Sequence, residues 1–138
     1  MSHDPNHLGQ ELIHALKQSN HAKALELINK GADVNKKDTG YGMTPLGWAI
    51  ENGLKNVVYK LIEVGADIHY INGRGDAPLT IASRKKNNFD IITKLLELGA
   101  DFNKYDIEDS MFYEYDRELL SWAAQNGRAD IVLKKIWY

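Results

Sequence analysis

Cysteine is absent from the 138 residues of this sequence. That absence excludes a disulfide framework, a thiolate metal site and a cysteine nucleophile. It also favours an intracellular protein, because disulfides are typical of oxidising compartments. An excess of positive charge is missing too, since 17 Lys and Arg stand against 19 Asp and Glu. Because the chain has no basic field to attract phosphate backbones, nucleic acid is not expected as a partner.

Long hydrophobic runs are also missing. The first residues, MSHDPNHLGQEL, have neither the positive start nor the apolar run of a secretory signal. No segment approaches the roughly 18 apolar residues of a membrane span. We therefore expect a cytoplasmic protein with no membrane partner, although delivery into a host cell as an effector stays open. The hydrophobic share of 43% is enough to bury the core of a single domain, which we place at residues 1–138.

What the sequence does contain is an internal repeat. The pentapeptides GADVN, GADIH and GADFN begin at Gly31, Gly65 and Gly99, which are 34 residues apart. Each follows an amphipathic run, as in KALELINK, NVVYKLIEV and FDIITKLLEL. A second marker recurs as TPLGWAI from Thr44, APLTIAS from Ala77 and, more loosely, ELLSWAA. A fixed period of this length indicates stacked repeat units.

The local chemistry of one unit predicts two short helices. Thr44 is a good N-cap, and Pro45 stands at the first helical position, where its missing N–H has no cost. Gly53 ends the first helix, because glycine readily takes the left-handed conformation. The run 57–62 then places its apolar residues on one buried stripe, and Gly65 ends the second helix.

These motifs resemble the ankyrin repeat over nearly the whole chain, from about Gln10 to Tyr138. The resemblance implies an all-α solenoid of stacked helix-turn-helix units joined by β-hairpin-like loops. We place the repeat units at 5–35 (an N-terminal cap), 36–69, 70–103 and 104–138 (a C-terminal cap with an enlarged hairpin). Ankyrin repeats typically carry His after the TPL triplet, where this chain has Gly47, Thr80 and Ser121. Thr and Ser can still bond to the local backbone, whereas Gly47 cannot.

No catalytic constellation emerges from the sequence, and no enzyme, cofactor or metal is expected. Asp33, Asp67 and Asp101 occupy one position in successive units, so we expect them to bond to loop amides rather than flank a substrate. The N-terminal histidines, which include His7, are expected to be solvated rather than to bind a metal. The dipeptide Asp4-Pro5 argues against a regular helix at the start of the chain.

Aromatic residues at two places suggest a partner surface. Trp48 and Trp122 share one repeat position, with Ile81 between them, and either form a packing ladder or line the concave face as anchors. About six extra residues enlarge the last hairpin, YDIEDSMFYEYD from Tyr105 to Asp116. This acidic, aromatic segment either contacts a basic or mixed partner surface or covers the last repeat.

The resemblance implies a protein-protein interaction module, an adaptor, inhibitor or scaffold, that uses hairpin tips and first helices on its concave face. Another protein is therefore the expected partner, and the chain is expected to be a monomer. The alternative is a recognition or targeting fragment of a larger enzyme or pathogen effector. The tripeptide Arg74-Gly75-Asp76 is interpreted as a hairpin tip rather than as an integrin signal. The predicted contact residues are Lys36, Lys37, Tyr41, Trp48, Tyr70, Arg74, Asp76, Ile81, Arg84, Tyr105, Phe112, Tyr113, Tyr115 and Trp122.

Overall fold

The computed structural model describes residues 4–85, 87–101 and 112–132, and all regular structure in these ranges is helical. This confirms the all-α fold class. The chain divides into two compact units, Met1–Ile81 and Ala82–Tyr138, here called the N-terminal and C-terminal units. The helices are α1 (Pro5–Lys17), α2 (His21–Asn29), α3 (Pro45–Glu51), α4 (Lys55–Glu63), α5 (Pro78–Ser83), α6 (Phe89–Glu97) and α8 (Phe112–Gln125). None of the described helices is long and apolar enough to cross a membrane.

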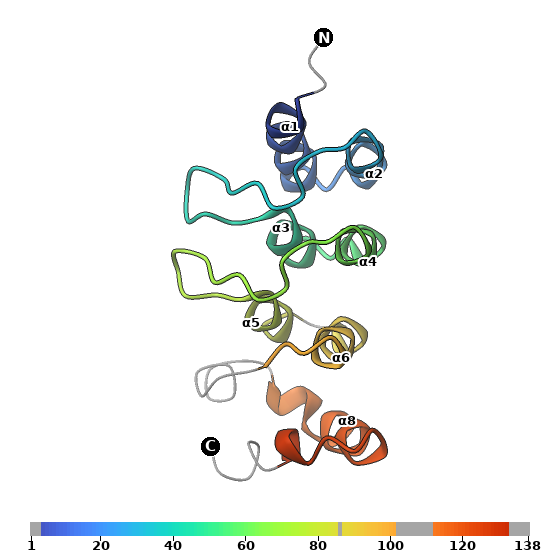
Figure 1. Ribbon diagram of the computed structural model, residues 1–138. Coiled ribbons are helices and arrows are strands. Elements are labelled where there is room, and N and C mark those ends of the chain that lie inside the picture. Colours follow the sequence, from blue (N-terminus) through green and yellow to red (C-terminus); the bar gives the residue numbers. More distant parts are fainter. Residues whose placement is uncertain (1–3, 86, 102–111, 133–138) are drawn as a thin grey trace. The chain divides into compact units, whose positions relative to one another are not determined.

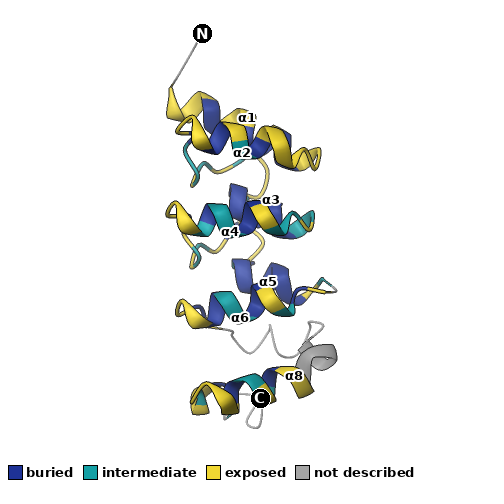
Figure 2. Cartoon of the chain, turned by 90° about the vertical axis from the view of Figure 1, so that its right-hand side faces the viewer, coloured by how far each residue is buried: buried dark blue, intermediate teal, exposed yellow. Residues whose placement is uncertain are grey.

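The N-terminal unit is built from two helix pairs. Helix α1 packs on α2 and α3 packs on α4, and the pairs contact each other through α1 with α3 and α2 with α4. Leu12, Leu16, Leu46 and Leu61 are among the side chains that this packing buries fully. Helix α3, which lies behind α4 in Figure 2, is buried along most of its length. Each pair buries what its neighbour leaves uncovered, as the repeat pattern predicts.

Both first helices begin with the same local chemistry. The predicted N-cap Thr44 is confirmed, because its side chain accepts from the Gly47 N–H at 3.4 Å and Pro45 follows at the first helical position. The expectation that Asp4-Pro5 opposes a helix was wrong. Asp4 is the N-cap of α1, its Oδ1 accepting from the Asn6 N–H at 3.2 Å, and Pro5 is the first residue of the helix. Proline is tolerated there because that N–H has no helical acceptor.

The second helices all end in the same way. Gly31, Gly65 and Gly99 have φ values of 95°, 100° and 97°. At the middle one, the following Ala66 N–H reaches back to the Leu61 carbonyl at 2.9 Å, and the other two ends carry the equivalent bond. This is the Schellman arrangement, which satisfies helix carbonyls and turns the chain sharply away. The predicted role of Gly65 is thus confirmed.

Position 47, where the family typically has histidine, is glycine in this chain, and the Met43 side chain packs against it. A Cβ at Gly47 would lie 3.1 Å from the Met43 Cε, so the thioether occupies the space that a side chain would need. The Met43 sulfur in turn accepts from the Asn72 side-chain amide at 3.0 Å. In the next repeat, the Thr80 hydroxyl accepts from the Ala77 N–H at 3.4 Å, which confirms the predicted bond to the local backbone.

The C-terminal unit contains α6 and α8, which contact each other. Leu119 and Ala123 of α8 are fully buried. Helix α8 begins at Phe112, so the prediction of a hairpin running to Asp116 was wrong for its last five residues. Phe112 and Tyr115 precede Leu119 by seven and four positions, the spacing of one helix face, and this periodicity extends the helix upstream. Residues 105–111 of that prediction lie outside the described residues.

Arg128 holds the turn after α8 against the end of α6. Its guanidinium donates to the Leu96 carbonyl at 2.8 Å and to both Asp130 carboxylate oxygens at 3.1 Å. The hydrogen bond from Arg128 holds the pKa of the Asp130 carboxyl below its usual range. In the N-terminal unit Asn52 makes the comparable link, because its amide donates to the Leu16 carbonyl at 2.7 Å.

We predict that Arg128→Ala lowers the free energy of unfolding of the C-terminal unit by about 1 kcal/mol, because a partly buried carbonyl loses its donor. Urea denaturation followed by circular dichroism measures this. The control Asp130→Asn removes only an exposed ion pair and costs less, roughly 0.5 kcal/mol or below. Because the pKa of Asp130 is lowered in the fold, the ion pair's contribution is present above the ordinary aspartate pKa and fades as the pH falls through the lowered value. Equal losses in both variants would contradict the importance of the carbonyl bond.

Candidate partner-binding surface

Two neighbouring loops of the N-terminal unit, 36–43 and 70–76, form one surface and are called the paired loops below. Both project to the same side of the helix pairs (Figure 1). Their backbones meet where the Gly73 N–H donates to the Tyr41 carbonyl at 2.6 Å. A Cβ at Gly73 would lie 2.9 Å from that same carbonyl oxygen, so the approach requires glycine. The two loops therefore touch through their main chains.

Two cation-π contacts cross between the paired loops in opposite directions. The Lys37 ammonium of the first loop lies 4.7 Å from the centre of the Tyr70 ring in the second. The Arg74 guanidinium of the second loop lies 5.1 Å from the centre of the Tyr41 ring in the first. Each contact is worth about 0.5–1 kcal/mol at an exposed site. Together with the backbone bond they fix how the loop tips lie relative to each other.

Asp38 organises the first of these loops. Its Oδ1 accepts from the N–H groups of Gly40, Gly42 and Met43, each at 3.1 Å. The loop is closed by the Asp38 N–H, which donates to the Met43 carbonyl at 2.9 Å. A carboxylate with three amide donors holds the turn without any strand pairing.

The second Asp38 oxygen ties the loop to the helices. It accepts from the Trp48 indole N–H at 2.9 Å, and the Lys17 ammonium lies 4.0 Å away. The same ammonium stands 5.2 Å from the centre of the Trp48 ring. Trp48 is half-buried, so it packs within the unit and leaves part of its surface exposed, and its role as an anchor for a partner stays a prediction.

Asn72 has the corresponding role in the second loop. The side chain is 7% exposed, and its Oδ1 accepts from the Arg74 and Asp76 N–H groups at 2.9 and 3.1 Å. The backbone N–H of Asn72 donates to the Asp76 carbonyl at 3.0 Å. Asp38 and Asn72 were both missed in the sequence reading. Their signal is an Asp or Asn followed within two residues by Gly, which is typical of side-chain-capped turns.

The paired loops expose cations and bury carboxylates. Lys37 and Arg74 are exposed, and Lys36 is half-buried with its ammonium 2.6 Å from the Asn6 side-chain oxygen. In contrast the Asp38 side chain is 8% exposed and Asp76 is 7% exposed. The described charges that face solvent at the loop tips are therefore positive.

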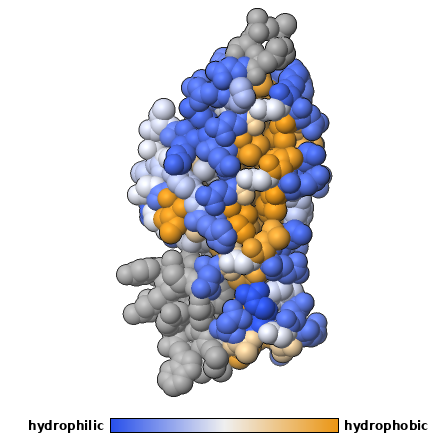
Figure 3. Space-filling view, viewed as in Figure 1, coloured by the Kyte–Doolittle hydropathy of each residue, from blue (hydrophilic) through white to orange (hydrophobic). Residues whose placement is uncertain are grey.

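Two large apolar side chains are exposed in the same loops. Tyr41 and Ile71 are each 60% exposed, and Ile71 was also missed in the sequence reading. Figure 3 shows a separate hydrophobic spot on the side where the loops project, with polar surface beside it. An exposed aliphatic and an exposed aromatic side chain beside cations are a combination found at binding surfaces.

Other predicted contact residues fall elsewhere. Ile81 is 4% exposed and Asp76 is buried, so neither is available to a partner. Arg84 is exposed and Trp122 is half-buried, and both belong to the C-terminal unit. Tyr105 and the side chains of Phe112, Tyr113 and Tyr115 lie outside the described residues. The structure brings Lys37 to Tyr70 and Arg74 to Tyr41. Lys36 instead bonds to Asn6 of α1, and Trp48 bonds to Asp38 of the first loop.

The repeated aspartates bond to the loop backbone. The Asp33 carboxylate accepts from the Asn35 N–H, and the Asp67 carboxylate from the His69 N–H, both at 2.9 Å, which confirms their predicted role. Asp101 is exposed at the edge of the described residues. Within the described part of the chain, no three His, Asp or Glu side chains stand close enough to hold a metal ion.

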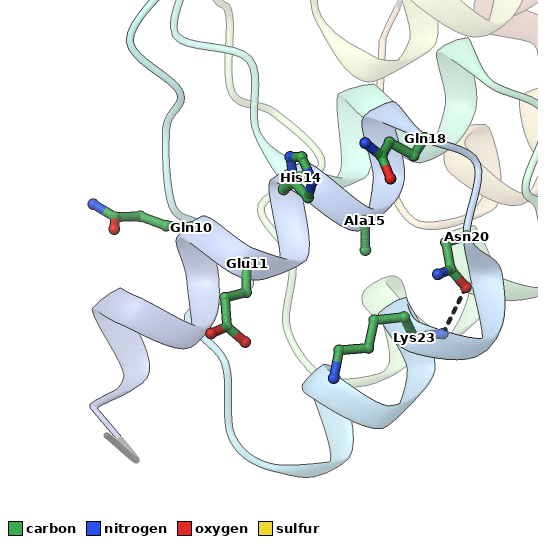
Figure 4. A pocket seen from close by; sticks show the side chains of 7 residues that line it. All are labelled: Gln10, Glu11, His14, Ala15, Gln18, Asn20 and Lys23. Atoms are coloured by element: carbon green, nitrogen blue, oxygen red, sulfur yellow. Dashed lines mark hydrogen bonds between the residues drawn. The ribbon is translucent and has the colours of Figure 1, made fainter. Parts of the chain in front are cut away.

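A groove of about 450 Å³ runs along α1 beside the start of α2 (Figure 4). The side chains that line it are Gln10, Glu11, His14, Ala15, Gln18, Asn20 and Lys23. Asn20 caps α2 by accepting from the Lys23 N–H at 3.1 Å. The groove is open, and its lining offers no nucleophile with an adjacent base, so it lacks the features of a catalytic pocket.

Stacked helix pairs whose connecting loops project to one side are the architecture of a helical repeat protein. The profile described as ankyrin repeats (3 copies) matches residues 12–106, and the chain belongs to this family. Ankyrin repeats are protein-interaction modules. The resemblance stated from the GAD and TPL motifs is thereby confirmed.

Three relatives illustrate how widely the repeat occurs. A putative ankyrin repeat protein of Rickettsia bellii (strain RML369-C) is 40% identical over 68 residues, 49% of this chain and 40% of that protein. The putative ankyrin repeat protein FPV031 of Fowlpox virus (strain NVSL) is 34% identical over 98 residues, 71% of this chain and 29% of the relative. The 2-5A-dependent ribonuclease of Mus musculus is 35% identical over 71 residues, 51% of this chain and 10% of the ribonuclease. The chain therefore matches less than half the length of each of these relatives.

We predict that Asp38→Ala lowers the free energy of unfolding of the N-terminal unit by about 2 kcal/mol, because three amides and an indole N–H lose the carboxylate oxygens that accept from them. Trp48 fluorescence, measured with Trp122 and Trp137 changed to Phe, should shift as its hydrogen bond is lost. Asp38→Asn should lose less, since its amide oxygen can still accept from the backbone. The matched control Thr39→Ala changes an exposed neighbour and should stay within about 0.5 kcal/mol. A loss in Asp38→Ala no larger than in this control would show that the loop does not depend on the carboxylate.

Proposed function

We propose that this chain is a protein-protein interaction module, acting as an adaptor, inhibitor or scaffold, that binds its partner through the paired loops and the adjoining face of α3. The observation that carries the proposal is the pair of opposed cation-π contacts, Lys37 on Tyr70 and Arg74 on Tyr41. They join the tips of two successive loops into one surface whose exposed side chains are aromatic, aliphatic and cationic. Family membership supports the same function.

Pre-organisation is the physical reason for preferring this surface. A loop that must be ordered on binding loses conformational entropy and hence affinity, roughly 0.5–1.5 kcal/mol for each immobilised side chain. Asp38 and Asn72 already order the two loop backbones, and the cation-π contacts already order Tyr41 and Arg74. A partner therefore meets a surface whose shape is set before contact.

The module is proposed to have no catalytic activity of its own and to act as a cytoplasmic monomer without cofactor, nucleic acid or membrane. A secondary contact region is proposed in the C-terminal unit, comprising Arg84, Trp122 and the acidic, aromatic segment 105–116. Its Tyr105, Phe112, Tyr113 and Tyr115 suit a basic or mixed partner surface.

A second candidate is favoured by one observation. The chain spans 10% of the mouse 2-5A-dependent ribonuclease that it resembles, so ankyrin repeats also occur within much larger enzymes. We propose as the alternative that these repeats are the recognition or targeting part of a larger enzyme or pathogen effector. The binding surface would be the same in both cases, and the full reading frame distinguishes them.

Affinity capture with mass spectrometry tests the proposed surface. We predict that Tyr41→Ala combined with Arg74→Ala reduces recovery of a specific partner by roughly tenfold or more, because an exposed aromatic and its cation are removed together. The matched control Lys23→Ala with Lys30→Ala changes an exposed residue of α2 and its exposed C-cap residue, and it should leave recovery unchanged.

Two further results of the capture experiment are decisive. Equal recovery by the loop variant and the unchanged chain would contradict binding through the paired loops. A third variant with a shortened 105–116 segment tests the secondary region separately, and unchanged recovery there would remove that region from the proposal. Each variant is first checked for folding by circular dichroism, so that a loss of partner is not confused with a loss of structure.

A further inference from the structure

The exposed charge of the paired loops differs from the charge that their sequence suggests. Residues 36–43 and 70–76 contain three cations and two carboxylates. Both carboxylates are buried, Asp38 beneath three loop amides and the Trp48 indole, and Asp76 in the second loop. The charged groups that a partner can touch in these loops are therefore cations, on a chain whose formal net charge is -2. This local reversal of sign bears on the choice of partner.

We infer that the paired loops bind an acidic peptide segment that carries an apolar side chain. The inference rests on the proposed function and adds the chemistry of the partner to it. Lys37 of the first loop and Arg74 of the second supply the positive charge. Ile71, which lies in the second loop with Arg74 and is 60% exposed, supplies an apolar contact. Carboxylates of the segment pair with the cations while its apolar side chain covers Ile71 and the open part of Tyr41.

The cations keep N–H donors for a ligand while they lie over the tyrosine rings. A guanidinium that lies over a ring presents its N–H groups at its edge, where a carboxylate can accept two parallel hydrogen bonds. Arg74 is held in this way 5.1 Å from the Tyr41 ring centre. The ring thus positions the cation, and the side-chain entropy of Arg74 is already partly lost before a carboxylate binds.

A nucleic acid suits this surface less well. Base recognition on single strands uses free aromatic faces, and one face of both Tyr41 and Tyr70 is already covered by a cation. Three cations are also few for phosphate-backbone binding, which depends on many such contacts. A short acidic peptide needs only two or three cations and one apolar contact.

Fluorescence anisotropy of labelled probes tests the inference with the full chain. The probes are a short peptide of alternating Glu and Leu, its counterpart with Gln in place of Glu, and a single-stranded oligonucleotide. We expect the Glu peptide to bind, and to bind roughly tenfold more weakly to the variant Lys37→Gln with Arg74→Gln, because two charge contacts are lost. Added salt should weaken the same binding. The control variant Lys23→Gln with Lys30→Gln has the same net charge and should bind as the unchanged chain does.

A conservative double substitution distinguishes a loss of charge from a loss of folded structure. Lys37→Arg with Arg74→Lys keeps both charges and both ring contacts and should retain most of the binding, which a merely misfolded surface would not. Failure of the Glu peptide to bind the unchanged chain would overturn the inference, as would equal loss in the Lys23 and Lys30 control. Tighter binding of the oligonucleotide would overturn it in favour of nucleic acid. Equal binding of the Gln peptide would overturn the acidic partner alone, and the capture experiment would still decide the proposed function.

Discussion

The left-handed residue that follows α1, α2, α3, α4 and α6 is the constraint on which this fold depends. At Gly65 a positive φ lets the chain leave α4 while the following N–H groups return to helix carbonyls. The same conformation recurs at Gly31 and Gly99, and also within the helix pairs at Gly53 and at Ser19, a residue for which it is uncommon. Helices this short cannot stack in register unless each ends at a fixed place. The positions of the helix ends therefore determine the length of the repeat, and the repeat length determines where the loops project.

The binding surface follows from those ends by a second set of local contacts. Once the chain has turned away from α2 or α4, it has no strand partner, and a side chain must satisfy the loop amides. Asp38 and Asn72 do so by different chemistry, a carboxylate in one loop and an amide in the next. The carboxylate costs more to bury than the amide, and the Trp48 indole and the nearby Lys17 ammonium offset that cost. A structural need of the loop thus places Trp48 at the candidate surface.

The sequence pattern predicted the helix pairs well and the surface only in part. Thr44-Pro45 and Gly65 were interpreted correctly because capping depends on a few adjacent residues. Asp4-Pro5 has the same capping chemistry as Thr44-Pro45, so the prediction of no helix there was wrong: proline at the first helical position removes no helical hydrogen bond. The enlarged hairpin was placed too far along the chain, since the helical spacing of Phe112 and Tyr115 before Leu119 was overlooked.

The sequence alone determined the period, the ends of the helices and the family, because each depends on residues close together in the chain. Only the tertiary structure decided what the loop tips present to a partner. Asp76 lies beside Arg74 in sequence, yet one side chain is buried and the other exposed. Lys37 and Tyr70 meet across more than thirty residues, as do Arg74 and Tyr41. Such contacts exist only after helix pairs have stacked, because stacking is what brings successive loops side by side.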